Sequence, residues 1–172
     1  MKRLKKRGEK VWKESEILRT ISGIFEFIIV INAILWLWFP LSFLNWRVDQ
    51  NYFISFLVAL IITIPCCIIM FKGIKDAGVE TLKPSIETKM YGGIYKYIRH
   101  PQSLGEFPTF IALGFFVNSW FLVILFAIYI IIYIPIMIYF EEKDLIMRFG
   151  EKYKEYQNRT GAFFPKIRKL AI

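Results

Sequence analysis

Four long apolar stretches alternate with polar segments along this chain. The apolar stretches cover residues 20–39, 52–71, 103–117 and 120–140. About 20 apolar residues cross the hydrocarbon core of a bilayer, so three of the stretches are long enough to span it and residues 103–117 are short for a full span. The pattern predicts an all-α, polytopic integral membrane protein with about four transmembrane helices.

The polar segments predict how this single membrane domain, residues 1–172, is organised. Only Asn118 and Ser119 separate the last two apolar stretches, so these should form a tight antiparallel hairpin. The expected parts are a cytosolic N-terminal segment at 1–19, two spans within 20–72, a cytosolic loop at 73–99, the helical hairpin at 100–140 and a C-terminal segment at 141–172.

The C-terminal segment has its own periodicity. Leu145, Phe149, Tyr153 and Tyr156 follow one another at steps of four, four and three residues. Such spacing places them on one face of a helix. It predicts a cytosolic amphipathic helix over residues 141–158 that follows directly on the last span.

Composition and charge agree with a membrane protein. The chain is 56% hydrophobic and carries a net charge of +9. Of its 23 basic residues, 22 flank the apolar stretches on what would be one side, which is the positive-inside pattern. We therefore expect both termini on the cytosolic face and anionic membrane lipids as partners of the basic charge. Nothing in this distribution indicates nucleic acid or an obligate protein partner.

The candidate chemistry begins where the 73–99 loop meets the third apolar stretch. Arg99, His100 and Pro101 lie there, and His100 is the only histidine. One interpretation is an interfacial cluster, with the proline starting a helix at its favoured position. The other is a site for an anionic group beside a helix N-terminus, where backbone amides and the helix dipole favour anions. With one histidine and two adjacent cysteines in an apolar run, the sequence predicts no metal site.

Acidic residues supply the second half of the candidate site. Glu141 and Glu142 end the last apolar stretch, and the hairpin returns them to the bilayer face that carries Arg99 and His100. They are either the solvated end of a span or carboxylates that contact a ligand. Glu106 and Glu26 interrupt apolar stretches, and an ionisable group at membrane depth usually faces a cavity or a partner. Glu26 fits helix packing and cavity lining equally well.

These residues together resemble a known family. The chain reads Gly93-Ile94-Tyr95-x-Tyr97-x-Arg99-His100-Pro101-x-x-x-Gly105, then Glu141-Glu142-x-x-Leu145-Ile146-x-x-Phe149-Gly150-x-x-Tyr153-x-x-Tyr156, then Phe164-Pro165. Over residues 90–166 this is similar to the isoprenylcysteine carboxyl methyltransferases, part of a wider superfamily that includes phospholipid methyltransferases.

The resemblance implies S-adenosylmethionine as methyl donor, with S-adenosylhomocysteine as its product, bound in a cytosol-facing pocket. It also implies a lipophilic small-molecule or prenylated acceptor that enters from the membrane. By position, the cofactor-binding candidates are Tyr97, His100, Pro101, Leu104, Gly105, Glu141, Glu142, Tyr153 and Tyr156. The catalytic candidates are Arg99, Glu106 and Glu142.

The identity of the acceptor stays open in the sequence. The carboxylate of a prenylated cysteine is the first expectation, and Arg99 could orient it with its planar fork of donors. The carboxyl methyltransferases of eukaryotes carry an arginine shortly before the acidic pair, but residues 134–139 contain no basic residue. That absence favours a lipid amine or a small thiol, whose proton Glu106, Glu141 or Glu142 could receive.

Two further classes remain as alternatives. One is a sterol-reductase-like membrane protein that binds NADPH, although such chains are usually much longer. The other is a non-catalytic helical protein whose basic loops bind anionic lipid.

Overall fold

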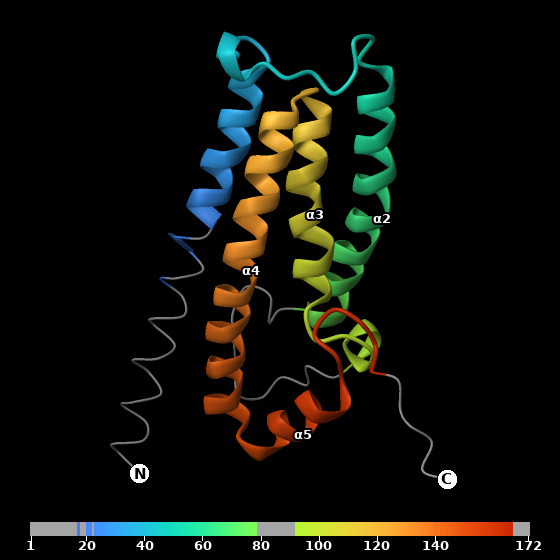
Figure 1. The fold of residues 1–172 in the computed structure, drawn as a ribbon. Coiled ribbons are helices and arrows are strands. Elements are labelled where there is room, and N and C mark those ends of the chain that lie inside the picture. The colour runs from blue at the N-terminus through green and yellow to red at the C-terminus, as the bar shows by residue number, and fades with distance from the viewer. Residues whose placement is uncertain (1–16, 18–19, 22, 79–91, 167–172) are drawn as a thin grey trace.

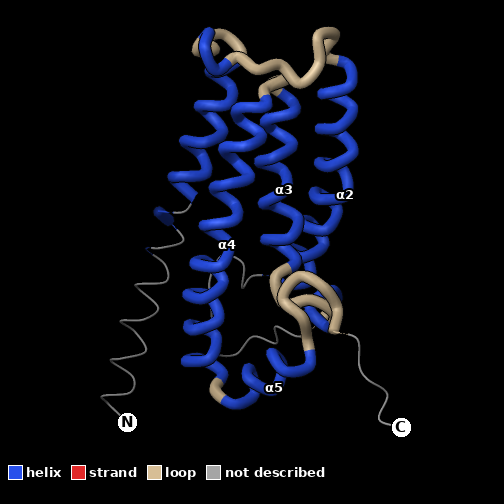
Figure 2. The backbone as a smooth tube through the Cα atoms, viewed as in Figure 1, coloured by secondary structure: helices blue, strands red, loops and turns tan. Residues whose placement is uncertain are grey.

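A computed structural model describes residues 17, 20–21, 23–78 and 92–166. Almost all of the predicted N-terminal segment 1–19, the middle of the predicted 73–99 loop and the last six residues lie outside this range. Within it, helices are joined by loops and no strand occurs (Figure 2). The predicted all-α fold class is therefore confirmed.

The described elements follow the hydrophobic pattern closely. They are the helix Gly23–Trp36, η1 (Ser42–Leu44), α2 (Phe53–Ala77), η3 (Gly93–Lys96), α3 (Pro101–Phe116), α4 (Trp120–Phe149) and α5 (Glu151–Arg159). The hairpin turn lies where it was predicted: Asn118 adopts a left-handed φ of 56°, and the Ser119 side chain caps α4 by accepting a hydrogen bond from the Leu122 amide.

The long helices stand side by side as a bundle (Figure 1). Helix α3 packs against both α2 and α4, and Gly23–Trp36 lies on the other side of α4. The segment 37–52 crosses one end of the bundle, and α5 turns across the opposite end (Figure 1). The segment 37–52 thus covers one end of the bundle and α5 covers the other.

Small residues bring α2 and α3 together. The buried residues of α2 are Ser55, Ala59 and Gly73. On the facing side, a Cβ added to Gly105 would collide with the Cys66 carbonyl oxygen and come within 2.5 Å of the Met70 amide nitrogen. Close backbone approach through small residues is the usual way in which helices pack inside a bilayer.

A compact aromatic core joins α3 and α4. Phe107, Phe110 and Phe126 are buried there, and the Phe107 ring meets the Tyr133 ring edge to face at 5.8 Å. Outside this core, most large apolar side chains of α2 and α4 are exposed. Both helices are long and apolar enough to cross a membrane, and the hydrocarbon core of a bilayer would remove these exposed side chains from water. The full count of four spans stays a prediction.

The C-terminal helix departs from the prediction. Residues 141–158 do not form one amphipathic helix, because α4 continues to Phe149 and α5 begins at Glu151. Gly150, with a φ of 60°, ends α4 and its amide donates to the Ile146 carbonyl at 2.8 Å. The 30 residues of α4 extend about 45 Å, and Glu141 lies about 33 Å along it, at the edge of a hydrocarbon core about 30 Å thick.

Candidate functional site

Four charged side chains meet at the end of the bundle where α5 lies. We call Arg99, His100, Glu141 and Glu142 the ionic cluster. The first two precede α3 and the last two lie in α4, so the hairpin brings together residues more than forty positions apart. This is the juxtaposition that the sequence predicted.

Arg99 links the two helices to the C-terminal segment. Its Nε donates to Glu142 Oε1 at 2.8 Å. Its Nη1 donates to the Gln157 carbonyl at 3.2 Å and also to the Thr160 carbonyl. Both carbonyls lie at the end of α5, where the helix dipole favours a cation. The guanidinium side chain is only 12% exposed, so it is largely committed to contacts within the protein.

His100 is clamped between the two carboxylates. Nδ1 lies 3.1 Å from Glu141 Oε2, and Nε2 lies 3.1 Å from Glu142 Oε1. Only the protonated ring can donate from both nitrogens. Burial by itself lowers the pKa of His100, but the hydrogen bonds and negative charges of Glu141 and Glu142 outweigh it and raise that pKa to about 9. At neutral pH the cluster therefore holds two cations and two carboxylates.

Backbone contacts hold the C-terminal segment beside the cluster. The Arg99 amide donates to the Gly161 carbonyl at 2.9 Å, and the His100 amide donates to the Ala162 carbonyl at 3.0 Å. The loop that follows α5 thus runs alongside the start of α3 (Figure 1). We call residues 150–166 the closing segment, because it covers one side of the cluster.

The end of α2 and η3 supply a third wall. Gly93 has a φ of 52°, and a Cβ there would collide with the Asp76 carboxylate, which accepts a hydrogen bond from the Ile94 amide at 2.7 Å. The Tyr156 hydroxyl donates to the Tyr95 carbonyl at 2.6 Å. Burial, followed by the charge of Glu141, raises the pKa of Tyr95 to about 12, so its hydroxyl stays protonated. These contacts fix η3 against the closing segment.

A pocket of about 320 Å³ opens beside the ionic cluster. Its lining combines apolar side chains with a carboxylate, an amide and an ammonium group: Tyr139, Glu142, Lys143, Ile146, Met147 and Gln157. A pocket with this mixture suits a ligand that has both a flat or apolar part and charged groups.

One buried hydroxyl is unused within the described residues. Tyr153 is 1% exposed, and no hydrogen-bond partner for its hydroxyl lies within the part of the chain that the structure describes. Burying a hydroxyl without a partner is costly. Its charged neighbours are Glu142, Glu141 and Arg99, so a bound ligand at this place would have a donor available.

Other predicted site residues lie elsewhere or have structural contacts. Tyr97 is largely exposed, and Pro101 is buried where it starts α3. Gly105 faces the backbone of α2 rather than the cluster. Glu106 lies six residues beyond His100, about 9 Å deeper along the bundle, and hydrogen-bonds to Glu26. Leu104 is partly buried in the first turn of α3.

Gln157 was not among the site residues that the sequence predicted. Its side-chain amide donates to Glu142 Oε2 at 2.7 Å, and it lines the pocket. The signal was available, because Tyr153, Tyr156 and Gln157 stand at i, i+3 and i+4 and such residues share a helix face. The predicted helix face was chosen by its apolar and aromatic residues, so the amide side chain of Gln157 was not included.

Comparison with known proteins identifies the family. A family model described as phospholipid methyltransferase matches residues 56–152, more than half of the chain. The chain belongs to the phospholipid methyltransferase family. This confirms the resemblance found in the sequence. The matched range includes α3 and the ionic cluster, begins earlier than the resemblance at residues 90–166 did, and ends just before Tyr153 and Tyr156.

Relatives of this family member have named activities. The chain is 29% identical over 156 residues to a methanethiol S-methyltransferase of Pseudomonas deceptionensis, covering 82% of this chain and 57% of the relative. It is 27% identical over 152 residues to a methanethiol S-methyltransferase of Crocosphaera subtropica, covering 82% and 58%. The chain thus spans somewhat over half the length of these two relatives.

A third relative matches more locally. It is methanethiol S-methyltransferase 1 of Bradyrhizobium diazoefficiens, which is 34% identical over 93 residues, or 54% of this chain and 30% of the relative. The apolar helices α2 and α4, together with the family, indicate a membrane protein.

Proposed function

We propose that this chain transfers a methyl group from S-adenosylmethionine to the sulfur of a small thiol at the membrane surface. Two lines of evidence support the reaction class. The chain belongs to the phospholipid methyltransferase family, and the pocket beside the ionic cluster offers mixed apolar and charged contacts of the kind that such a donor needs.

The observation that carries the acceptor class is the engagement of Arg99. A carboxylate acceptor needs a cation to orient it, and Arg99 was the sequence-based candidate. Its donors instead hold Glu142 and two carbonyls of the closing segment. Breaking a buried, charge-assisted network to bind a substrate carboxylate would cost several kcal/mol, on the order of 3–5. A neutral thiol makes no such demand, and the relatives are named as methanethiol S-methyltransferases.

In this proposal the protein supplies position, charge balance and exclusion of water. When bound, S-adenosylmethionine would supply a sulfonium methyl group: the bond from the methyl carbon to the donor sulfur would break as its bond to the acceptor sulfur forms. The products would be a methyl thioether, neutral S-adenosylhomocysteine and the proton of the thiol. Glu142 and Gln157, which line the pocket, would hold the donor there. Alignment of this kind is worth about 7–11 kcal/mol of barrier in favourable cases.

The proton of the thiol needs an acceptor in the same cluster. Glu141 has the most exposed carboxylate there, with a side chain that is 33% exposed. We assign it as the base, since Glu142 is held by Arg99, His100 and Gln157. Arg99 and His100 act as positioning residues that keep both carboxylates ionised.

A prenylated-cysteine carboxylate is the second candidate acceptor. The apolar side of the pocket favours this acceptor. Tyr139 and Met147 line the pocket and are also exposed on the surface of α4. A lipophilic acceptor could reach the pocket from the bilayer along this face. A lipid amine fits the same approach.

The test is titration of the detergent-purified chain with S-adenosylhomocysteine, with NADPH as a second probe, followed by a methyl-transfer assay. Saturable binding of the first probe alone is expected. Glu142→Gln and Arg99→Ala should each weaken it at least about tenfold, whereas Glu151→Gln on exposed α5 removes the same charge as Glu142→Gln and should leave it unchanged.

The assay then ranks acceptors with labelled donor. Methanethiol or ethanethiol should be methylated faster than a farnesylated N-acetylcysteine or a phosphatidylethanolamine. Binding of NADPH alone would reject a methyltransferase, and faster turnover of the farnesylated carboxylate would reject the thiol assignment.

A further inference from the structure

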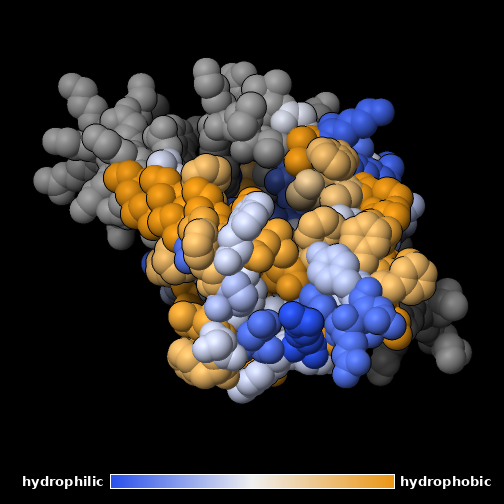
Figure 3. Space-filling view, turned by 90° about the horizontal axis from the view of Figure 1, so that it is seen from above, coloured by the Kyte–Doolittle hydropathy of each residue, from blue (hydrophilic) through white to orange (hydrophobic). Residues whose placement is uncertain are grey.

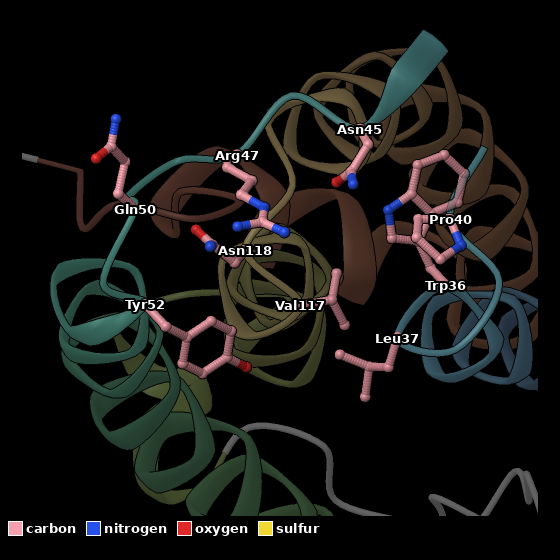
Figure 4. Close-up of a pocket in the computed structure, with 9 residues that line it drawn as sticks. All are labelled: Trp36, Leu37, Pro40, Asn45, Arg47, Gln50, Tyr52, Val117 and Asn118. Atoms are coloured by element: carbon pink, nitrogen blue, oxygen red, sulfur yellow. The ribbon is translucent and has the colours of Figure 1, made fainter. Parts of the chain in front are cut away.

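A second pocket lies at the opposite end of the bundle from the ionic cluster. Its volume is about 230 Å³, several times the ~30 Å³ that a water molecule occupies in the liquid. Figure 4 shows its wall, which is built from the end of the first helix, the segment 37–52 and the turn between α3 and α4. The lining residues are Trp36, Leu37, Pro40, Asn45, Arg47, Gln50, Tyr52, Val117 and Asn118.

Two donors in this pocket have no acceptor among the described residues. The Arg47 guanidinium makes no hydrogen bond or ion pair with the part of the chain that the structure describes. The Trp36 indole N–H is buried and likewise has no partner there. In Figure 4 both groups turn toward the same space. An arginine and an indole offer donors but no acceptor, so the part of the pocket between them favours an oxyanion.

The walls of the pocket are held in place before any ligand arrives. Asn118 Oδ1 accepts from the Val48 and Asp49 amides at 3.1 and 3.0 Å, and its Nδ2 donates to the Asp49 carbonyl at 2.8 Å. The Trp36 ring stacks on Phe121 with centroids 5.3 Å apart.

Backbone conformation adds to this rigidity. Tyr52 and Asn118 are the described non-glycine residues with positive φ, at 63° and 56°, and both line the pocket. Such conformations cost energy and are found at ligand-binding places more often than elsewhere. A preorganised wall lowers the entropic cost of binding.

Charge at this end of the molecule is sparse. Arg47 is the only basic residue between residues 20 and 71. The nearby Asp49 carboxylate does not pair with Arg47 in the described structure. It accepts a hydrogen bond from the Ile54 amide, at the start of α2, at 3.1 Å. Seen from this end in Figure 3, a small group of hydrophilic residues lies within a mostly hydrophobic surface. A single unpaired cation beside apolar surface suits a ligand that has one negative charge and an apolar remainder.

We propose that this pocket binds the phosphate group of a glycerophosphate. The Arg47 fork would hold two phosphate oxygens, as guanidinium groups commonly do, and the Trp36 N–H would donate to one of the phosphate oxygens as well. Leu37, Pro40 and Val117 give the glycerol carbons an apolar wall. The phosphate can belong to a phospholipid headgroup or to a soluble glycerophosphate, and both present anionic phosphate oxygens to the pocket.

Calorimetric titration of the full chain, purified and delipidated in a neutral detergent, tests this site. The probes are dihexanoyl phosphatidylglycerol, glycerol 3-phosphate and dihexanoyl glycerol, which lacks the phosphate. Arg47→Gln should raise the Kd of whichever phosphate-bearing probe binds by at least about tenfold, as expected for loss of a charged hydrogen bond. Trp36→Phe should raise the same Kd by about twofold to tenfold. Arg159→Gln removes an equal charge at the other end and should change nothing.

Each outcome decides the proposal. Binding of phosphatidylglycerol alone supports the site with a lipid headgroup as its ligand, and binding of glycerol 3-phosphate as well supports a soluble source. Binding of dihexanoyl glycerol with equal affinity, or an unchanged Kd in Arg47→Gln, would overturn it. If Arg47→Gln unfolds, Arg47→Lys keeps the charge, loses the fork and should still weaken phosphate binding.

Discussion

At the scale of single residues, the ionic cluster is a set of positions that depend on one another. His100 keeps two carboxylates within hydrogen-bonding distance, and Arg99 connects one of them to the closing segment. Both side chains are therefore engaged in contacts within the protein. The candidate site therefore links ligand binding to folding, because the groups that shape it also hold α3, α4 and the closing segment together.

This dependence gives a pH effect on stability. The pKa of His100 is about 9 in the folded protein, above its ordinary value of 6.5. Its contribution is fully present below pH 6.5 and is lost as the pH rises through 9, on the order of 3 kcal/mol. The melting temperature should fall between pH 7 and 9.5. The melting temperature of His100→Gln should be lower than that of the unchanged protein at pH 7 and should fall less between pH 7 and 9.5. Parallel melting curves for the two proteins would contradict this assignment.

Sequence reasoning succeeded for residues whose chemistry is unusual in their surroundings. A lone histidine between an arginine and a proline, and a carboxylate pair ending an apolar run, are visible without coordinates. Gln157 and the role of Trp36 were not. Trp36 ends the apolar stretch 20–39, where an aromatic residue at the membrane interface is expected. That its ring stacks on Phe121 and its N–H faces a pocket depends on a three-dimensional contact that no local pattern encodes.

At the scale of elements, α3 is the part on which the site depends. It follows directly on Arg99 and His100, packs against α2 through Gly105, and packs against α4 through Phe107 and Phe110. The starts of α2, α3 and α4 were predicted to within two residues because hydrophobic runs determine them, whereas α2 and α4 continue past the predicted ends at residues 71 and 140 into polar sequence. The break at Gly150 was missed because the apolar spacing continues through it, whereas the change in direction comes from one backbone torsion.

The close approach of α2 and α3 can be tested with one methyl group. Gly105→Ala places a Cβ against the Cys66 carbonyl and the Met70 amide, so the helices must separate. Overpacking of this kind costs about 1–3 kcal/mol. A lower melting temperature in detergent is expected, together with weaker binding at the cluster.

Gly23→Ala is the matched control for this variant. It adds the same methyl group where nothing lies within 4 Å, and alanine is the better helix former by up to about 1 kcal/mol. Its melting temperature should stay the same or rise. Equal melting temperatures for the two variants would mean that Gly105 is not tightly packed.

At the scale of the whole molecule, the two ends of the bundle are chemically different. One end carries the ionic cluster, the closing segment and most of the described basic residues, and the other carries Arg47 and the second pocket. Because S-adenosylmethionine is a soluble cytosolic compound, the proposed methyl transfer requires the cluster to face the cytosol. The positive-inside pattern makes the same prediction independently.

Labelling of single cysteines tests that orientation. In a chain with Cys66 and Cys67 replaced by serine, Ser42→Cys and Glu151→Cys place a thiol at an exposed position near each end of the bundle. A membrane-impermeant maleimide added to intact cells should label Ser42→Cys and leave Glu151→Cys unlabelled until the membrane is permeabilised. The physical reason is that the predicted four-span topology puts 22 of 23 basic residues on the side of Glu151, and cationic loops are retained in the cytosol. The reverse labelling would place the ionic cluster outside, away from its proposed donor. Labelling of both positions in intact cells would contradict the spanning of the bilayer by the bundle as a unit.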